Sequence, residues 1–362
     1  MVTATAAASK LPINVGPLTG LGSFCLYTAR ALKQFSDLYM EGERPEVVWD
    51  LRHVEPTHMS MAGLTAFLSV AHRLRQFTDH AQPARVVWNP EIFAFWDDIS
   101  LFRISQQYDL LKWPEGIIGG YSPGQTNPNT ELLVVPYENV PDRTVNIDYW
   151  KTWKDSVRQK FKEDLLLRCG RLFQPSRRSG DFPQELLDNV AVACAELVVN
   201  SLLWGRSTAF VGLQRSGKGI TVAVCDSGVG FITSIRGQSK LRAMNSKDHA
   251  EALAIGAVVN RREYGLRRVI NTVIKNGGWV IMSSFDTEIH WKDSLWERAK
   301  AGAGRIEESA LDLKGLMNAI GSPVRGKPTL DDRESGYCKA WDYGLRGTRI
   351  TFEIPLSTGG RF

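Results

Sequence analysis

A carboxylate and an amide lie one helical turn apart in the apolar segment 183–204. They are Glu196 and Asn200, and a spacing of four residues places both on one face of a helix. Burying them in such a segment is unfavourable unless they have partners. An amide oxygen suits Mg²⁺, and a carboxylate beside a water suits a general base. By itself the pair is equally typical of a helix with two exposed polar residues.

A second motif, Asp226-Ser-Gly-Val-Gly230, directly follows an apolar segment that is expected to be a strand. A carboxylate at a strand end can accept a hydrogen bond from an exocyclic amine. The glycines Gly228 and Gly230 let the backbone approach a ligand closely. A site that requires this hydrogen bond prefers adenine to guanine. Alone, the motif is also typical of an ordinary turn.

Two shorter motifs follow. Tyr264-Gly265-Leu266-Arg267 lies at the start of a predicted helix over residues 266–275, and backbone N–H groups at a helix N-terminus favour phosphate oxygens. Gly347-Thr348 opens the last predicted strand, where the hydroxyl could share hydrogen bonds with Asp226 and a base. Neither motif is informative by itself.

The elements between these motifs occur in a definite order. We expect a helix over 183–204 and a hairpin with strands at 209–214 and 220–225. After an irregular segment come the helix 266–275 and strands at 279–283 and 349–354, the last two separated by an insertion, 285–343.

Together, the motifs and their order resemble the ATP-binding domain of the gyrase, chaperone, histidine kinase and mismatch-repair (GHKL) ATPases. The resemblance covers residues 181–362 and implies a Bergerat-type α/β sandwich with a mixed sheet that binds ATP and Mg²⁺. It implies that Glu196 is catalytic, polarising a water or a substrate hydroxyl, and that Asn200 holds Mg²⁺. Segment 232–263 would be the lid. The implied ATP-binding residues are Asn200, Asp226, Gly228, Gly230, Gly265, Leu266, Arg267 and Thr348.

The first half alternates predicted strands (11–15, 47–51, 86–88) with predicted helices (24–39, 61–77, 90–104), so we expect a parallel or mixed α/β sheet over residues 1–118. Val47-Val-Trp-Asp-Leu51 followed by Met61-Ala-Gly-Leu64 resembles a STAS-type domain, the fold of anti-anti-sigma factors. In that family a phosphorylated serine stands just before the glycine. Met61 and Ala62 occupy those places here, with Thr57 and Ser60 nearby, which argues against a phosphoacceptor. A generic α/β domain is the alternative.

The turn-rich segment 119–146 is predicted to be a linker, and 147–180 a connecting helix. The net charge of +5 arises from 44 basic and 39 acidic residues and does not by itself indicate nucleic-acid binding. Five scattered cysteines give no zinc pattern and favour a reducing compartment. No secretory signal pattern opens the chain, and its most apolar segment, 190–204, is too short to span a bilayer. We therefore expect a cytoplasmic protein without membrane association.

Three functions fit these observations. The first is a Mg²⁺-dependent ATP-binding protein that acts as an ATPase or an ATP-driven regulatory switch, with a protein partner or a second copy of itself. The alternative is a serine/threonine kinase of the anti-sigma-factor type that acts on a STAS-domain partner, and the third is a nucleotide-binding regulator without catalysis. A histidine kinase is disfavoured, because no helix pair carrying a phosphoacceptor histidine precedes the ATP domain. Four arginines (Arg261, Arg262, Arg267, Arg268) leave nucleic acid open, but a phosphate-binding lid accounts for them.

Overall fold

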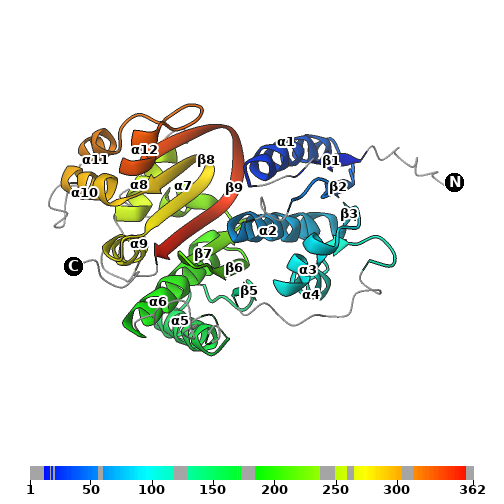
Figure 1. Ribbon diagram of the computed structural model, residues 1–362, viewed down its shortest axis with the longest axis horizontal. Coiled ribbons are helices and arrows are strands. Elements are labelled where there is room, and N and C mark those ends of the chain that lie inside the picture. Colours follow the sequence, from blue (N-terminus) through cyan, green and yellow to red (C-terminus); the bar gives the residue numbers. More distant parts are fainter. Residues whose placement is uncertain are drawn as a thin grey trace. The chain divides into compact units, whose positions relative to one another are not determined.

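The protein is described by a computed structural model that covers residues 12–16, 18, 21–55, 60–117, 129–142, 144–168, 170, 172, 184–236, 249–258, 265–303 and 313–355. The chain divides into two compact units, unit 1 (Met1–Thr126) and unit 2 (Asn127–Phe362). Each unit contains a sheet with helices (Figure 1). The predicted α/β class is therefore confirmed, as one parallel and one antiparallel sheet.

Unit 1 is built on a parallel sheet whose strands follow chain order. The strands are β1 (Ile13–Val15), β2 (Val47–Asp50), β3 (Gln82–Arg85) and β4 (Leu111–Lys112). The connections carry α1 (Leu21–Met40), α2 (Met61–Thr78), and the pair α3 (Pro90–Asp98) and α4 (Leu101–Gln107). Helix α2 begins at Ser60, whose hydroxyl accepts a hydrogen bond from the N–H of Gly63 at 3.2 Å. All four residues of β2 are buried, as is usual for an inner strand of a parallel sheet.

Two expectations for unit 1 were wrong in detail. The strand predicted at 86–88 lies earlier, at β3, and Val87 and Trp88 are 59% and 58% exposed. The buried Gln82 amide fixes this register, because it accepts a hydrogen bond from the N–H of Val47 and donates one to Thr78. The helix predicted over 90–104 is broken between α3 and α4, where Ser100 adopts a left-handed conformation (φ 61°).

The sheet of unit 2 has five strands in the order β5-β6-β7-β9-β8. They are β5 (Thr130–Val135), β6 (Ala209–Arg215), β7 (Gly219–Asp226), β9 (Tyr337–Pro355) and β8 (Trp279–Trp291). Every neighbouring pair is antiparallel, so the expectation of a mixed sheet was wrong. Residues 119–146, expected as a linker, contain β5, which pairs with β6. The turn-forming residues around this short strand obscured it in the sequence.

Six helical segments of unit 2 position its site. They are α5 (Ile147–Arg168), α6 (Gln184–Asn200), the π-helical turn η2 (Ser201–Gly205), α7 (Gly230–Arg236), α8 (His249–Val258) and α9 (Leu266–Lys275). Helix α6 packs against α5, α9 and the sheet. One continuous cluster of buried apolar side chains joins α6, α8 and α9 to strands β6 to β9. The site residues are therefore held by core elements rather than by surface loops.

Segment Glu185–Gly205 is long and apolar enough to cross a membrane by length and composition alone. In unit 2 it is a core helix, and 78% of its most apolar window is buried inside the protein. A buried helix of a globular domain passes the same test, so this segment is weak evidence for a membrane span.

Strand β8 folds back on itself at Phe285, which has a φ of 53°. The rings of Trp279 and His290 lie 5.5 Å apart, and the indole N–H of Trp291 lies 3.2 Å from the sulfur of Met282. In a straight strand, residues that far apart in sequence would be separated by roughly 30–36 Å. The bend lets β8 and the long curved β9 form two sheet segments (Figure 1).

The segment expected as an insertion, 285–343, is an outgrowth of this strand pair. β8 continues to Trp291 and β9 already begins at Tyr337. Between them lie α10 (Asp293–Gly302), α11 (Leu313–Ile320) and α12 (Leu330–Ser335). Both α11 and β8 pack against α8, so the outgrowth supports that helix from outside.

Candidate functional site

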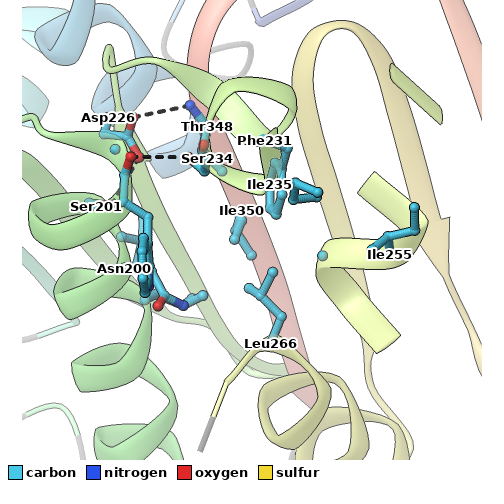
Figure 2. A pocket seen from close by; sticks show the side chains of 15 residues that line it. Asn200, Ser201, Asp226, Phe231, Ser234, Ile235, Ile255, Leu266, Thr348 and Ile350 are labelled. Carbon is cyan, nitrogen blue, oxygen red and sulfur yellow. Dashed lines mark hydrogen bonds between the residues drawn. The ribbon is translucent and has the colours of Figure 1, made fainter. Parts of the chain in front are cut away.

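The side chain of Asp226, the last residue of β7, is the polar centre of the candidate site. It is 2% exposed. One oxygen, Oδ1, accepts hydrogen bonds from the backbone N–H groups of Gly228 at 2.9 Å and Thr348 at 3.3 Å. The other, Oδ2, accepts one from the hydroxyl of Ser201 at 3.0 Å (Figure 2). Burial raises the pKa of Asp226 to about 6, although these bonds act in the opposite direction.

Glycines surround this carboxylate because backbone segments approach one another closely. A Cβ atom on Gly228 would lie 1.9 Å from the carbonyl oxygen of Gly205, and one on Gly347 would lie 2.0 Å from the carbonyl oxygen of Asp226. Gly230 begins α7 with a φ of +76°, a conformation that favours glycine. The Asp-x-Gly-x-Gly motif and the Gly-Thr motif thus meet at one carboxylate, although Asp226 and Thr348 are 122 residues apart in sequence.

The helix that carries the Glu-Leu-Val-Val-Asn motif ends in a π-helical turn. α6 gives way to η2 between Asn200 and Ser201. The wider turn aligns the Ser201 hydroxyl with Asp226 and the Gly205 carbonyl with the N–H of Val229, which donates to it at 3.0 Å. Single π-helical turns are frequently found at functional sites.

A pocket opens beside Asp226 (Figure 2). The cavity volume that the centres of water molecules can occupy is about 90 Å³. Since one water requires roughly 10–15 Å³ of such space, a small planar ring fits. Its polar lining residues are Asn200, Ser201, Asp226, Ser234 and Thr348, and its apolar ones include Leu197, Trp204, Val224, Phe231, Ile235, Ile255, Leu266 and Ile350. A few polar groups among apolar walls are typical of a site for an organic ligand.

Most of the residues singled out in the sequence lie at this pocket. Asn200, Asp226, Leu266 and Thr348 line it. Gly228 and Gly230 flank Asp226. Gly265 is the N-terminal cap of α9, one residue before Leu266, whereas Arg267 does not line the pocket. Tyr264 lies outside the described residues.

Glu196, the residue expected to be catalytic, is placed differently. It is 2% exposed and does not line the pocket. Its carboxylate faces α5, where Nε of Arg158 lies 2.6 Å from Oε1 and Nη2 of Arg158 donates a hydrogen bond to Oε2 at 3.1 Å. Burial raises the pKa of Glu196, and Arg158, Lys154 and Arg268 counteract this shift. The acid and the amide share a helix face but have different surroundings.

Part of segment 232–263, expected to be a lid, is a fixed wall of the pocket. Seven of the ten residues of α8 are buried, and Ile255 and Gly256 line the pocket. A Cβ atom on Gly256 would lie 2.6 Å from the ring of Phe231, so the α7–α8 packing is tight. Residues 237–248 and 259–264 lie outside the described residues.

Several residues of this region were not singled out in the sequence. Ser201, which donates a hydrogen bond to Asp226, directly follows Asn200. Its position next to that amide is the sequence feature that could have identified it as a site residue. Gly205 appeared as a helix end rather than as a contact of Asp226. Arg158 is one of many basic residues in α5, so nothing in the sequence marked it as the partner of Glu196.

The residues present fit a nucleotide with Mg²⁺. A buried acceptor beside apolar walls suits an aromatic base with an exocyclic amine, and the Asn200 amide supplies an oxygen ligand. Among the described residues, no group of three His, Cys, Asp or Glu side chains is placed to hold a metal. Mg²⁺ bound to phosphates needs one or two protein ligands rather than a complete cage.

No model of a known protein family, no curated protein and no solved structure matches the chain.

Proposed function

We propose that unit 2 binds ATP together with Mg²⁺, and that the protein is an ATPase or an ATP-driven regulatory switch. The observation that carries the proposal is the buried Asp226 carboxylate, which is oriented by Ser201, Gly228 and Thr348 at one end of an apolar pocket. Burying a carboxylate is unfavourable unless it has hydrogen-bond partners. A ligand donor would supply a further partner.

The hydrogen-bond pattern supports adenine as the base. All three protein groups around Asp226 donate, so the carboxylate acts as an acceptor throughout. The N6 amine of adenine is a donor, whereas guanine and hypoxanthine present an oxygen at the same place, and two acceptors repel one another. The apolar side chains of Val224, Ile255 and Ile350 would contact the ring.

The other end of the pocket supports a site for the phosphates. Asn200 would hold Mg²⁺, which, when bound, neutralises phosphate charge and polarises the terminal phosphoryl group. Leu266 opens α9, and the unpaired N–H groups of a helix N-terminus favour anions. Glu196, one turn from Asn200, is the group we assign as the base that accepts the proton of the attacking water.

Labelling with ATP that carries radioactive γ-phosphate tests the proposal and its alternative. Release of labelled phosphate without labelled protein supports the ATPase. Transfer of label to this chain or to an added STAS-domain protein supports the serine/threonine kinase. Neither outcome, with ATP binding intact, supports a nucleotide-operated regulator without catalysis, and absence of ATP binding refutes all three.

A further inference from the structure

The ion pair between Glu196 and Arg158 bears on how the proposed site is regulated. Glu196 shares a helix face with Asn200, but Asn200 lines the pocket and Glu196 does not. The guanidinium that holds Glu196 belongs to α5, a different helix. The side chains of the pair are 18% and 3% exposed, so solvent screens the interaction weakly.

Contact with Arg158 makes Glu196 a weaker base than burial alone would, because burial raises its pKa and Arg158 counteracts that shift. A carboxylate next to a guanidinium loses basicity, because the nearby positive charge stabilises its ionised form. The same contact draws the carboxylate toward α5, whereas a general base must reach the proton that it accepts. Oε1 also accepts no well-aligned hydrogen bond within the described residues, so the observed arrangement leaves it incompletely satisfied.

Helix α5 is also connected to the pocket by a second contact. The ring of Trp150 on α5 lies 6.2 Å from that of Trp204, edge to face, and Trp204 lines the pocket. Lys154 lies 5.3 Å above the Trp150 ring. A change in the position of Trp204 would thus be transmitted to α5, the helix whose Arg158 pairs with Glu196.

We propose that α5 is an autoinhibitory latch, in which Arg158 holds the carboxylate of Glu196 outside the pocket until the pair opens. This inference rests on the proposed function. Opening requires α5 to move relative to α6, or Arg158 to change its rotamer toward its exposed second partner, Asp155, at 2.5 Å. Within the described ranges, the charged groups that act on Glu196 are Arg158 and Lys154 from α5 and Arg268 from α9. After release, Arg268 and Lys154 still favour the ionised base.

The test compares the full-length wild type with Arg158→Gln, Arg158→Lys and the control Asp148→Asn. Calorimetry gives the affinity for Mg²⁺–ATP, phosphate release gives kcat, and thermal unfolding verifies the fold. We expect Arg158→Gln to raise kcat about tenfold while the Kd changes less than about twofold, because acid–base catalysis contributes on that scale or above. Arg158→Lys keeps the charge but lacks the planar fork, so its kcat should lie between the two. Asp148→Asn, at an exposed position in the first turn of α5, should leave kcat unchanged.

An unchanged or lower kcat in Arg158→Gln, with binding retained, would overturn the latch. If Arg158→Gln does not fold, Arg158→Lys decides by the same criterion. A second measurement needs no nucleotide. It is a pH titration followed by carbon-13 NMR on protein with labelled glutamate, in which the signal of Glu196 is identified by its loss in Glu196→Gln. A rise in the pKa of Glu196 in Arg158→Gln shows that the pair exists in solution, and its absence overturns the latch. If the wild type has this ion pair but does not bind ATP, the proposed function is refuted and not the ion pair.

Discussion

Two buried carboxylates, Glu196 on α6 and Asp226 at the end of β7, have different surroundings. Asp226 is surrounded by neutral donors: two backbone N–H groups and a hydroxyl. Glu196 is held by a guanidinium. Neutral donors orient a buried carboxylate without neutralising it, so it remains an acceptor for a neutral amine. A cation neutralises the carboxylate and keeps it from reacting. Under the proposed function, this difference fits a role in recognition for Asp226 and a role in turnover for Glu196.

The largest effect is expected for Glu196→Ala, because it removes the base that we assign. Turnover should fall by about 10²–10⁴-fold while ATP affinity is retained. The variant removes one partner of the half-buried Arg158, which still pairs with Asp155, so we expect the fold to lose about 1–3 kcal/mol. Phosphate release and chemical denaturation measure the two effects. The conservative Glu196→Gln controls for packing, and normal turnover in either variant would contradict the assignment.

Asp226→Asn should act on binding rather than on turnover of bound nucleotide. The substitution replaces one carboxylate oxygen by an NH₂ group. This new donor would face the donors that the carboxylate accepts from in the wild type, or the amine of adenine. ATP affinity should fall by about 100-fold, corresponding to roughly 2–3 kcal/mol for a hydrogen bond to a charged group. Asp331→Asn, on the exposed surface of α12, serves as a control. Unchanged affinity in Asp226→Asn would remove the distinction between the two carboxylates.

Gly228→Ala tests the backbone approach that orients Asp226. The added methyl group would overlap the carbonyl of Gly205, so the loop must move. We expect a loss of about 1–3 kcal/mol in the free energy of unfolding, together with weaker ATP binding. Gly217→Ala is the matched control, because no atom lies within 4 Å of its added Cβ. Equal unfolding free energies for the two variants would show that the approach is not tight.

The titration of Asp226 predicts a pH dependence. Its pKa is raised from 3.8 to about 6 in the folded chain, so its protonated form is favoured by folding. The contribution of Asp226 to stability is therefore fully present below about pH 4 and is lost as the pH rises through 6. ATP affinity should run the other way and weaken as the pH falls through 6, because protonation removes the charged acceptor. Calorimetry between pH 5 and 8 measures this, and Asp226→Asn should lack the dependence.

The smallest effect is expected for Ser201→Ala. It removes one of three donors to Asp226, and a single hydrogen bond contributes about 0.5–1.5 kcal/mol. ATP affinity should fall severalfold, and the pKa of Asp226 should rise further, because one group that stabilises its ionised form is lost. An effect as large as that of Asp226→Asn would mean that Ser201 contacts the ligand itself.

The sequence allowed the site to be predicted better than the sheet that carries it. The convergence of Asp226, Gly228 and Thr348 could be predicted because their motifs occur in a definite order between predicted elements, although each motif alone is typical of an ordinary turn. The bend of β8 at Phe285 could not be predicted, because a non-glycine residue with positive φ leaves no pattern in the sequence. β5 was missed because its partner lies far away in sequence. The Arg158 contact depends on how α5 packs on α6, which local patterns do not specify.

The most direct test of the central claim is a calorimetric titration of the wild type and Asp226→Asn with Mg²⁺–ATP and Mg²⁺–ITP. The two nucleotides differ at position 6 of the purine ring, where adenine carries an amine and hypoxanthine an oxygen. We predict that the wild type binds ATP at least about tenfold more tightly than ITP, and that Asp226→Asn loses this preference. Equal affinities in the wild type, or no magnesium-dependent affinity for ATP, would contradict it.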